Sequence, residues 1–101
     1  MKPYFIVLTR TFFQSSGKKK VLDLVKKSFP IFKKKPGLVS IASHISHDGT
    51  HTMTYMAWKD KESHEACMVS TDFEDLNEDW GKLLASGEAR FELQTYDLLN
   101  E

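Results

Sequence analysis

Four histidines have side chains that titrate close to neutral pH, so each of them could act as a base or as a metal ligand. Three of them, His44, His47 and His51, cluster around Asp48-Gly49. A tight turn at Asp48-Gly49 would place His47 on the opposite face of a hairpin from His44 and His51. No nearby cysteine or carboxylate completes a tetrahedral ligand set. The spacing therefore predicts no metal site.

His44 is the strongest candidate for a catalytic base. The strand pattern places it beside Ser40 and Ala42, whose small side chains leave room for a ligand. The alternative is a core or interface histidine that is hydrogen-bonded to a neighbour. His64 is the second candidate, because it lies in a short helix expected directly after Trp58 and faces either a pocket or water.

Further side chains near these histidines could bind a substrate. Tyr55 and Trp58 could flank an aromatic ring, although such residues more often pack in a core. Arg10 lies at a strand end, where it could attract an acidic substrate group or be solvated. Cys67 is expected to be a small buried residue of a helix and not a nucleophile, because no neighbouring residue would stabilise a thiolate.

The elements that position these residues follow from hydrophobic periodicity. The predicted strands cover residues 4–10, 38–47, 51–59 and 88–98. Predicted helices begin at Lys18, Lys61 and Thr71, and end at Pro36-Gly37, Met68 and Gly87. Pro30 is expected to kink or restart the first helix. The order β-α-β-β-α-α-β predicts an α+β fold, a ferredoxin-like sandwich with a four-stranded antiparallel sheet.

The two middle strands form a hairpin around Asp48-Gly49, a pair that favours a type I′ turn. In that register His47 opposes Thr50 and His44 opposes Met53, and opposed residues share a face. One face would carry Val39, Ile41, Ser43, Ile45, Thr52, Thr54, Met56 and Trp58, and the other Ser40, Ala42, His44, Ser46, His51, Met53, Tyr55 and Ala57. Because helices can cover only one face of such a sheet, the other face must meet a second subunit or remain wet.

Length and composition limit the class of protein. The 101 residues predict one domain, 1–101, and no apolar run is long enough to predict a membrane span. The single cysteine and the lack of a signal peptide favour a cytoplasmic location. Residues 1–50 carry ten Lys and Arg against two Asp and Glu, and residues 51–101 carry four against twelve. No aromatic residues interleave with the lysines, so two solvated helix faces are favoured over a nucleic-acid site.

Three short segments carry a resemblance to a known family. Pro36-Gly37-Leu38-Val39-Ser40, Trp58-Lys59-Asp60-Lys61-Glu62-Ser63 and Ser70-Thr71-Asp72-Phe73, in this order, resemble the antibiotic-biosynthesis-monooxygenase-like (ABM-like) family of small dimeric α/β-barrel proteins. With the flanking strands, the likeness covers nearly the whole chain. It implies a homodimer that closes two sheets into a barrel, with a pocket in each subunit between sheet and helices. Some members of the family oxidise aromatic polyketides or quinols without a metal or flavin, and others degrade haem.

The haem-degrading branch is identified by an Asn near the end of the first strand, a Trp in the short helix and a His in the next helix. This sequence has Thr9, Cys67 and Asn77 at the corresponding places. Without the histidine, haem iron lacks its axial ligand. We therefore do not expect haem degradation.

These observations lead to two functional hypotheses. The first is a cofactor-independent monooxygenase acting on a small aromatic, phenol or quinol. His44 would be its base, and Tyr55, Trp58, His64 and Arg10 would bind the substrate. No phosphate-binding loop, dinucleotide fingerprint or zinc spacing occurs in the sequence, so no cofactor is expected. The alternative is a non-catalytic homodimer that binds or senses a small apolar ligand.

Overall fold

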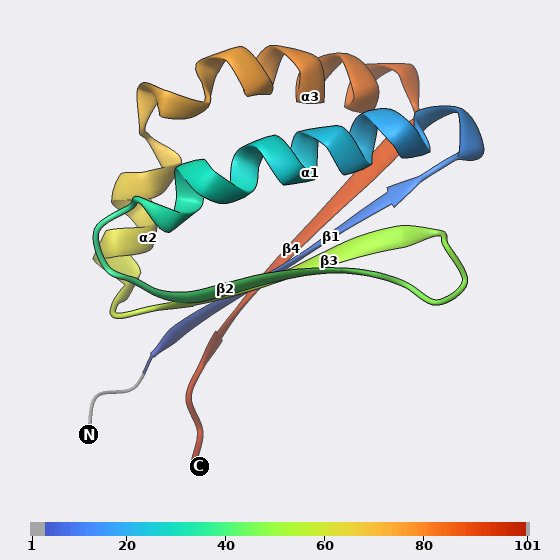
Figure 1. The fold of residues 1–101 in the computed structure, drawn as a ribbon. Helices are drawn as coiled ribbons and strands as arrows, with labels where there is room; N and C mark the ends of the chain where they lie inside the picture. The colour runs from blue at the N-terminus through green and yellow to red at the C-terminus, as the bar shows by residue number, and fades with distance from the viewer. Residues whose placement is uncertain (1–3, 101) are drawn as a thin grey trace.

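The computed structural model describes residues 4–100, in which three α-helices pack on one face of a twisted four-stranded antiparallel sheet (Figure 1). The elements are β1 (Phe5–Phe13), the short 3₁₀ helix η1 (Ser15–Gly17), α1 (Lys18–Lys33), β2 (Leu38–Ile45), β3 (His51–Trp58), α2 (Lys61–Met68), a second 3₁₀ helix η2 (Thr71–Phe73), α3 (Glu74–Ser86) and β4 (Ala89–Asp97). The strand order is β2-β3-β1-β4. The predicted ferredoxin-like α+β fold is confirmed.

The pairing of β2 with β3 follows the predicted register, with His44 opposite Met53. The register shifts once, at the start of β2, where Leu38 opposes Trp58 and Val39 is an extra, bulged residue. Leu38 therefore packs against the core beside Trp58, whereas Val39 is 50% exposed. The predicted register, in which Val39 shares a face with Ile41 and Trp58, was wrong at this position, because strand alternation alone does not reveal a bulge.

The hairpin loop differs from the predicted two-residue turn. The backbone N–H of Ser46 donates to the His51 carbonyl at 2.9 Å, which closes a four-residue loop, 47–50. Within this loop only Gly49 has a positive φ, 72°, whereas a type I′ turn needs two such residues. The loop is held instead by its side chains, because the Asp48 carboxylate accepts hydrogen bonds from the hydroxyls of Ser46 and Thr50. These hydrogen bonds lower the pKa of Asp48 to about 2. Both loops are centred between Asp48 and Gly49, so the strand register is unaffected.

The helices also differ from the prediction in detail. Pro30 lies within α1, which continues to Lys33 without a restart. The helix α2 begins at Lys61 as predicted, and Asp60 caps it, since its side chain accepts a hydrogen bond from the Ser63 N–H at 2.8 Å. The helix α3 begins at Glu74 and not at the predicted Thr71, because Ser70 caps a 3₁₀ turn over Thr71–Phe73 that leads into α3. No helix within residues 4–100 is long and apolar enough to cross a bilayer.

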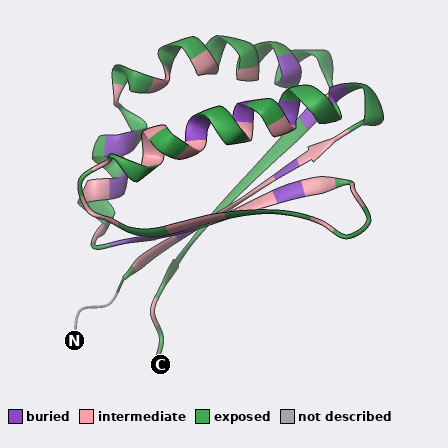
Figure 2. Cartoon of the chain, in the orientation of Figure 1, coloured by how far each residue is buried: buried purple, intermediate pink, exposed green. Residues whose placement is uncertain are grey.

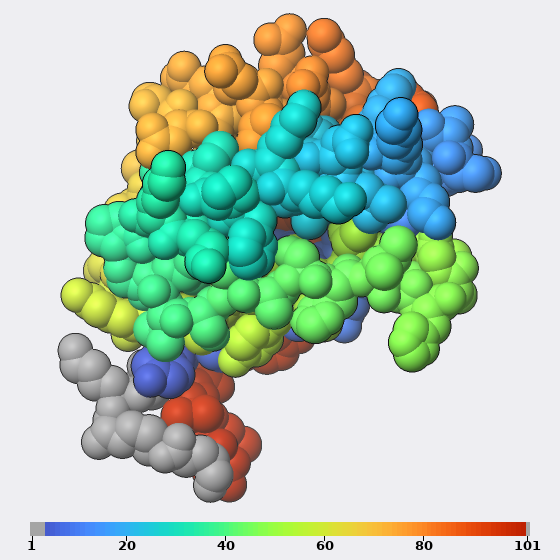
Figure 3. Space-filling model, viewed as in Figure 1, coloured from blue at the N-terminus to red at the C-terminus, as the bar shows by residue number. Residues whose placement is uncertain are grey.

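We call the helix-covered side of the sheet the inner face and the opposite side the outer face. Buried residues lie mainly between the sheet and the helices (Figure 2). Val7, Met56 and Trp58 from the sheet pack with Cys67 of α2. Side chains fill much of the space between α1 and the sheet that the ribbon leaves open (Figure 3). The helices thus build a core on the inner face only.

Candidate functional site

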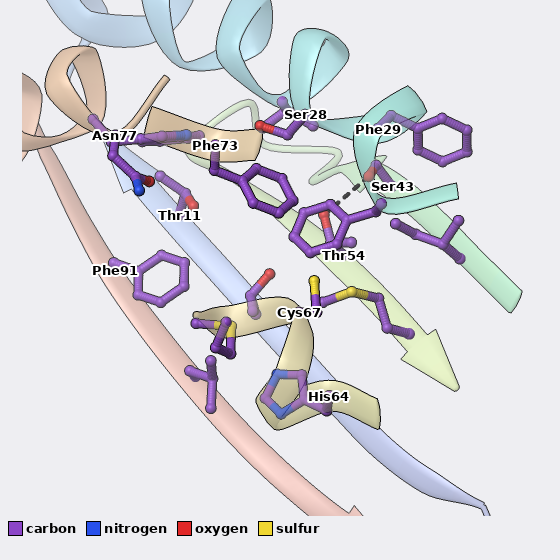
Figure 4. Close-up of a pocket in the computed structure, with 18 of the residues that line it drawn as sticks. Thr11, Ser28, Phe29, Ser43, Thr54, His64, Cys67, Phe73, Asn77 and Phe91 are labelled. Carbon is purple, nitrogen blue, oxygen red and sulfur yellow. Dashed lines mark hydrogen bonds between the residues drawn. The ribbon is translucent and has the colours of Figure 1, made fainter. Parts of the chain in front are cut away.

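A cavity of about 300 Å³ lies between the inner face of the sheet and the helices. This volume is at the small end of the range of roughly 300–1,000 Å³ that is typical of ligand pockets. Strands form its floor, and α1, α2, η2 and α3 provide the remaining walls (Figure 4). The location is the one that the family resemblance implied, between the sheet and the helices of one subunit.

Aromatic side chains form the roof of the cavity. They are Phe29 and Phe32 of α1, Phe73 of η2 and Trp80 of α3. The rings of Phe32 and Phe73 pack with their centroids 4.8 Å apart. None of the described residues that line the cavity is Asp, Glu, Lys or Arg. Walls of this composition favour a neutral, flat ligand, because a buried unpaired charge is costly.

Hydroxyl groups line the floor of the cavity. Thr9 and Thr11 come from β1, Ser43 from β2 and Thr54 from β3. The hydroxyls of Ser43 and Thr54 are 2.9 Å apart and hydrogen-bonded to each other (Figure 4). On the roof, the Ser28 hydroxyl donates to the Leu24 carbonyl of its own helix at 2.7 Å. The floor of the cavity therefore combines hydroxyls with apolar side chains such as Ile41 and Met56, and the roof is mainly aromatic.

His64 is the one histidine among the described residues that line the cavity. It is 8% exposed, and its ring lies 5.6 Å, centroid to centroid, from the rings of both Phe5 and Trp58. Burial lowers the pKa of His64 below its ordinary value of 6.5, although nearby Glu65 opposes the shift. Its Nε2 atom is buried and has no hydrogen-bond partner among residues 4–100. The imidazole is therefore neutral near pH 7, and its Nε2 is available to hydrogen-bond a ligand.

Cys67 also lines the cavity, one helical turn after His64. It is 2% exposed, and burial raises the pKa of its thiol. Such a thiol stays protonated and is a poor nucleophile. The prediction of a buried, unreactive cysteine agrees with this environment.

The ammonium group of Lys35 positions Phe73 at one end of the cavity roof. The Lys35 ammonium donates to the Ser70 hydroxyl at 2.7 Å and to the carboxylate of Asp72, and lies 5.6 Å from the centre of the Phe73 ring. The hydrogen bond from Lys35 lowers the pKa of Asp72. Phe73 is thereby held above the cavity by a contact between the end of α1 and the connection that follows α2.

The structure brings two of the five predicted site residues together, Trp58 and His64. Trp58 is fully buried in the core beside His64. The other three, His44, Tyr55 and Arg10, lie on the outer face. Met53 directly opposes both His44 and Arg10, and Tyr55 lies two residues further along the same strand. Directly opposed residues share a face, as do alternate residues of a strand.

This placement corrects the expectation that His44 is the base of a pocket between sheet and helices. Its neighbour Ser43 lines the cavity, so the side chain of His44 must point away from it. Small neighbours such as Ala42 suggested room for a ligand, but none of the helices in residues 4–100 covers that side of the sheet. Tyr55 and Arg10 are separated from the cavity for the same reason.

Sequence reasoning missed most of the cavity lining. Ser43 and Thr54 were predicted to share one face of the hairpin, as they do, but the ligand was expected beside His44 on the other face. A signal was present, because hydroxyl residues at alternating positions on a covered strand face need a polar partner. Within residues 4–100, no group of three or more His, Cys, Asp or Glu is placed to bind a metal ion.

Comparison with solved structures supports the fold. A structure described as an antibiotic biosynthesis monooxygenase matches with a TM-score of 0.77 and 14% identity, over 95% of this chain and 99% of the other. SnoaB, a cofactor-independent oxygenase from Streptomyces nogalater, matches with a TM-score of 0.74 and 10% identity, over 96% and 95%. A dimeric ferredoxin-like protein from an uncultured marine organism matches with a TM-score of 0.74 and 19% identity, over 99% of both chains.

No protein-family model and no curated protein sequence matches the chain. At identities below 20%, the three structural matches show a shared fold and not a shared reaction. The fold is that of the ABM-like and dimeric ferredoxin-like proteins, which confirms the resemblance found in the sequence.

Proposed function

We propose that this protein is a cofactor-independent oxygenase that binds a small neutral phenol or quinol in the cavity and works as a homodimer. The observation that carries the proposal is the neutral imidazole of His64, whose buried Nε2 has no hydrogen-bond partner among the described residues, in a cavity without charged side chains among its described lining residues. A neutral imidazole can accept the proton of a phenol. Aromatic walls bind the ring and keep water from reactive intermediates.

In this mechanism the substrate supplies all the electrons. His64 takes the phenol proton, and the phenolate transfers one electron to O₂. The resulting radical pair combines to a peroxide anion on a ring carbon, and the protonated imidazole returns its proton to this anion, which gives a hydroperoxide. The neutral imidazole then takes the hydrogen of that ring carbon as a proton while the O–O bond breaks, and the proton passes to the departing hydroxide, which leaves a quinone and water. One phenol and one O₂ thus give one quinone and one water, and each product receives one of the two oxygen atoms of O₂.

The structural neighbours support this reading by analogy. Two of them are described as an antibiotic biosynthesis monooxygenase and a cofactor-independent oxygenase. A third is described as a dimeric ferredoxin-like protein, which supports a homodimer. The outer face supports it as well, because Tyr55 and Tyr96 there are 38% and 45% exposed in the single chain. A second copy packed on this face would bury more than roughly 1,000 Å² in a stable dimer.

Oxygen uptake and quinone formation with a series of phenols test the proposal. His64→Ala should lower kcat by about 10²- to 10⁴-fold, as expected for loss of a general base. His44→Ala, which removes a histidine from the outer face, is the matched control and should retain turnover. Because only neutral imidazole accepts a proton, the rate should fall as pH drops below the His64 pKa, which lies under 6.5. Equal turnover in wild type and in a folded His64→Ala variant would refute this role.

A non-catalytic ligand-binding protein is the second candidate. The observation in its favour is that several cavity hydroxyls already have protein partners, such as Ser28 with the Leu24 carbonyl and Ser43 with Thr54. Such a cavity can hold a ligand without transforming it. Tight binding of a phenol without any oxygen uptake would favour this candidate.

A further inference from the structure

The hydroxyl groups on the cavity floor form a row across three neighbouring strands. Ser43 on β2 is directly opposite Thr54 on β3, and Thr54 is directly opposite Thr9 on β1. All three residues line the cavity. Elsewhere on the inner face, Val7 and Met56 pack in the apolar core, whereas Thr11 on β1 opposes Thr52 on β3. The row of Ser43, Thr54 and Thr9 differs from this second pair, because all of its members line the cavity, whereas Thr52 does not.

The row still has hydrogen-bonding capacity. Ser43 and Thr54 share one hydrogen bond at 2.9 Å. Each hydroxyl has one donor and two acceptor sites, so a single shared bond leaves both groups able to bind a ligand oxygen. Thr9 adds a second polar position on the neighbouring strand. The floor thus offers two anchors, the Ser43–Thr54 pair and Thr9.

The spacing of these anchors selects an oxygenation pattern. Adjacent strands lie about 4.8 Å apart, and the Cβ atoms of directly opposed residues such as Thr54 and Thr9 keep a similar separation. Oxygens on alternate carbons of a benzene ring match this separation, whereas oxygens on neighbouring carbons lie closer together. A ring with its edge on the floor would direct one oxygen to the Ser43–Thr54 pair and the other to Thr9. The rings of Phe32 and Phe73 would pack above it.

We propose that Ser43, Thr54 and Thr9 form a specificity-determining subsite for a neutral aromatic ring with oxygens on alternate carbon atoms. The inference rests on the proposed function in taking the cavity as the substrate site, and it adds the substitution pattern of the substrate. Neutrality follows from the walls, because a carboxylate in the cavity would meet no cationic side chain among the described lining residues.

Calorimetric titration without oxygen separates binding from turnover. The ligands are 1,3-dihydroxynaphthalene, 2,3-dihydroxynaphthalene, 2-naphthol and 2-naphthoate, which share one ring system. The 1,3-isomer should bind about three- to tenfold more tightly than the 2,3-isomer and 2-naphthol, which is the gain from one additional hydrogen bond. The carboxylate, 2-naphthoate, should bind more weakly than 2-naphthol.

Two variants test whether the preference for the 1,3-isomer depends on the floor hydroxyls. Thr9→Val and Thr54→Val each keep the branched shape of the side chain and remove its hydroxyl, and each should abolish the preference for the 1,3-isomer over 2-naphthol. Thr95→Val is the matched control. Thr95 opposes Val7 on the same face of the sheet but is exposed and does not line the cavity, so this variant should keep the preference. Thermal unfolding of each variant verifies that it is folded.

Equal affinity for the two dihydroxy isomers overturns the subsite, and so does an undiminished preference in both folded cavity variants. Binding of 2-naphthoate as tight as that of 2-naphthol overturns the requirement for a neutral ligand. Oxygen uptake is measured separately on wild type. If the two dihydroxy isomers bind equally but the wild type still consumes oxygen, the subsite is refuted and the oxygenase proposal is not. A preserved preference without uptake supports the subsite in a binding protein and removes the oxygenase.

Discussion

The two faces of the sheet use the same kinds of residue in different ways. His64 lies against the inner face, where burial lowers its pKa and leaves its Nε2 unpaired. His44 lies on the outer face and is exposed. Arg10, Arg90 and Glu92 also lie on the outer face, where Arg90 pairs with Glu92. A histidine of this fold therefore becomes a candidate base where the helices bury its ring, which lowers its pKa and leaves a nitrogen without a partner.

The largest expected difference between the faces is in stability. Trp58 is fully buried in the core on the inner face, so Trp58→Ala should lower the free energy of unfolding by about 3–5 kcal/mol. Tyr55→Phe on the outer face, 38% exposed in the single chain, should change it by less than about 0.5 kcal/mol. Urea denaturation at one fixed protein concentration measures both. Similar losses in the two variants would mean that the outer face contributes a core of its own.

The next effect concerns subunit association. Leu8 lies on the outer face opposite Tyr55, so Leu8→Asp should place an unpaired carboxylate in the proposed dimer interface. We expect the dissociation constant of the dimer to rise at least about 100-fold, which corresponds to roughly 2.7 kcal/mol. Sedimentation velocity over a range of concentrations measures it. Lys26→Asp, on the exposed side of α1, is the control and should leave the dimer intact. An unaltered dimer in Leu8→Asp would place the interface elsewhere.

The smallest effect is the pH dependence of stability. The folded-state pKa of His64 is lowered, so the unfolded chain binds more protons below about pH 6.5. The contribution of the neutral ring is fully present above that pH and is lost as the pH falls towards the folded-state pKa. Its slope is at most about 1.4 kcal/mol per pH unit. Urea denaturation between pH 7 and pH 5 should show a shallower decline in His64→Gln than in wild type, and equal slopes would contradict the assignment.

The sequence predicted the fold because its signals are local. Strand alternation, the start of a helix at Lys61 and the position of the turn around Asp48-Gly49 each depend on a few residues and are found in the structure, although the turn is a four-residue loop and not type I′. The bulge at Val39 was not predictable from alternation, since an extra residue changes the face of one side chain without changing composition. The cavity was harder still, because Phe32 and Phe73 meet only after distant segments pack.

Gly37 gives the Pro36-Gly37 motif a meaning that is independent of any reaction. Its φ is +87°, and a Cβ atom there would lie 2.3 Å from the Ser63 hydroxyl oxygen. Its carbonyl accepts a hydrogen bond from the Lys59 N–H at 2.8 Å. Any other residue would have to displace the start of α2, so the position admits one residue type. This requirement comes from the backbone of the fold and does not depend on which residues line the cavity. A motif of this kind identifies the fold and carries no information about the substrate.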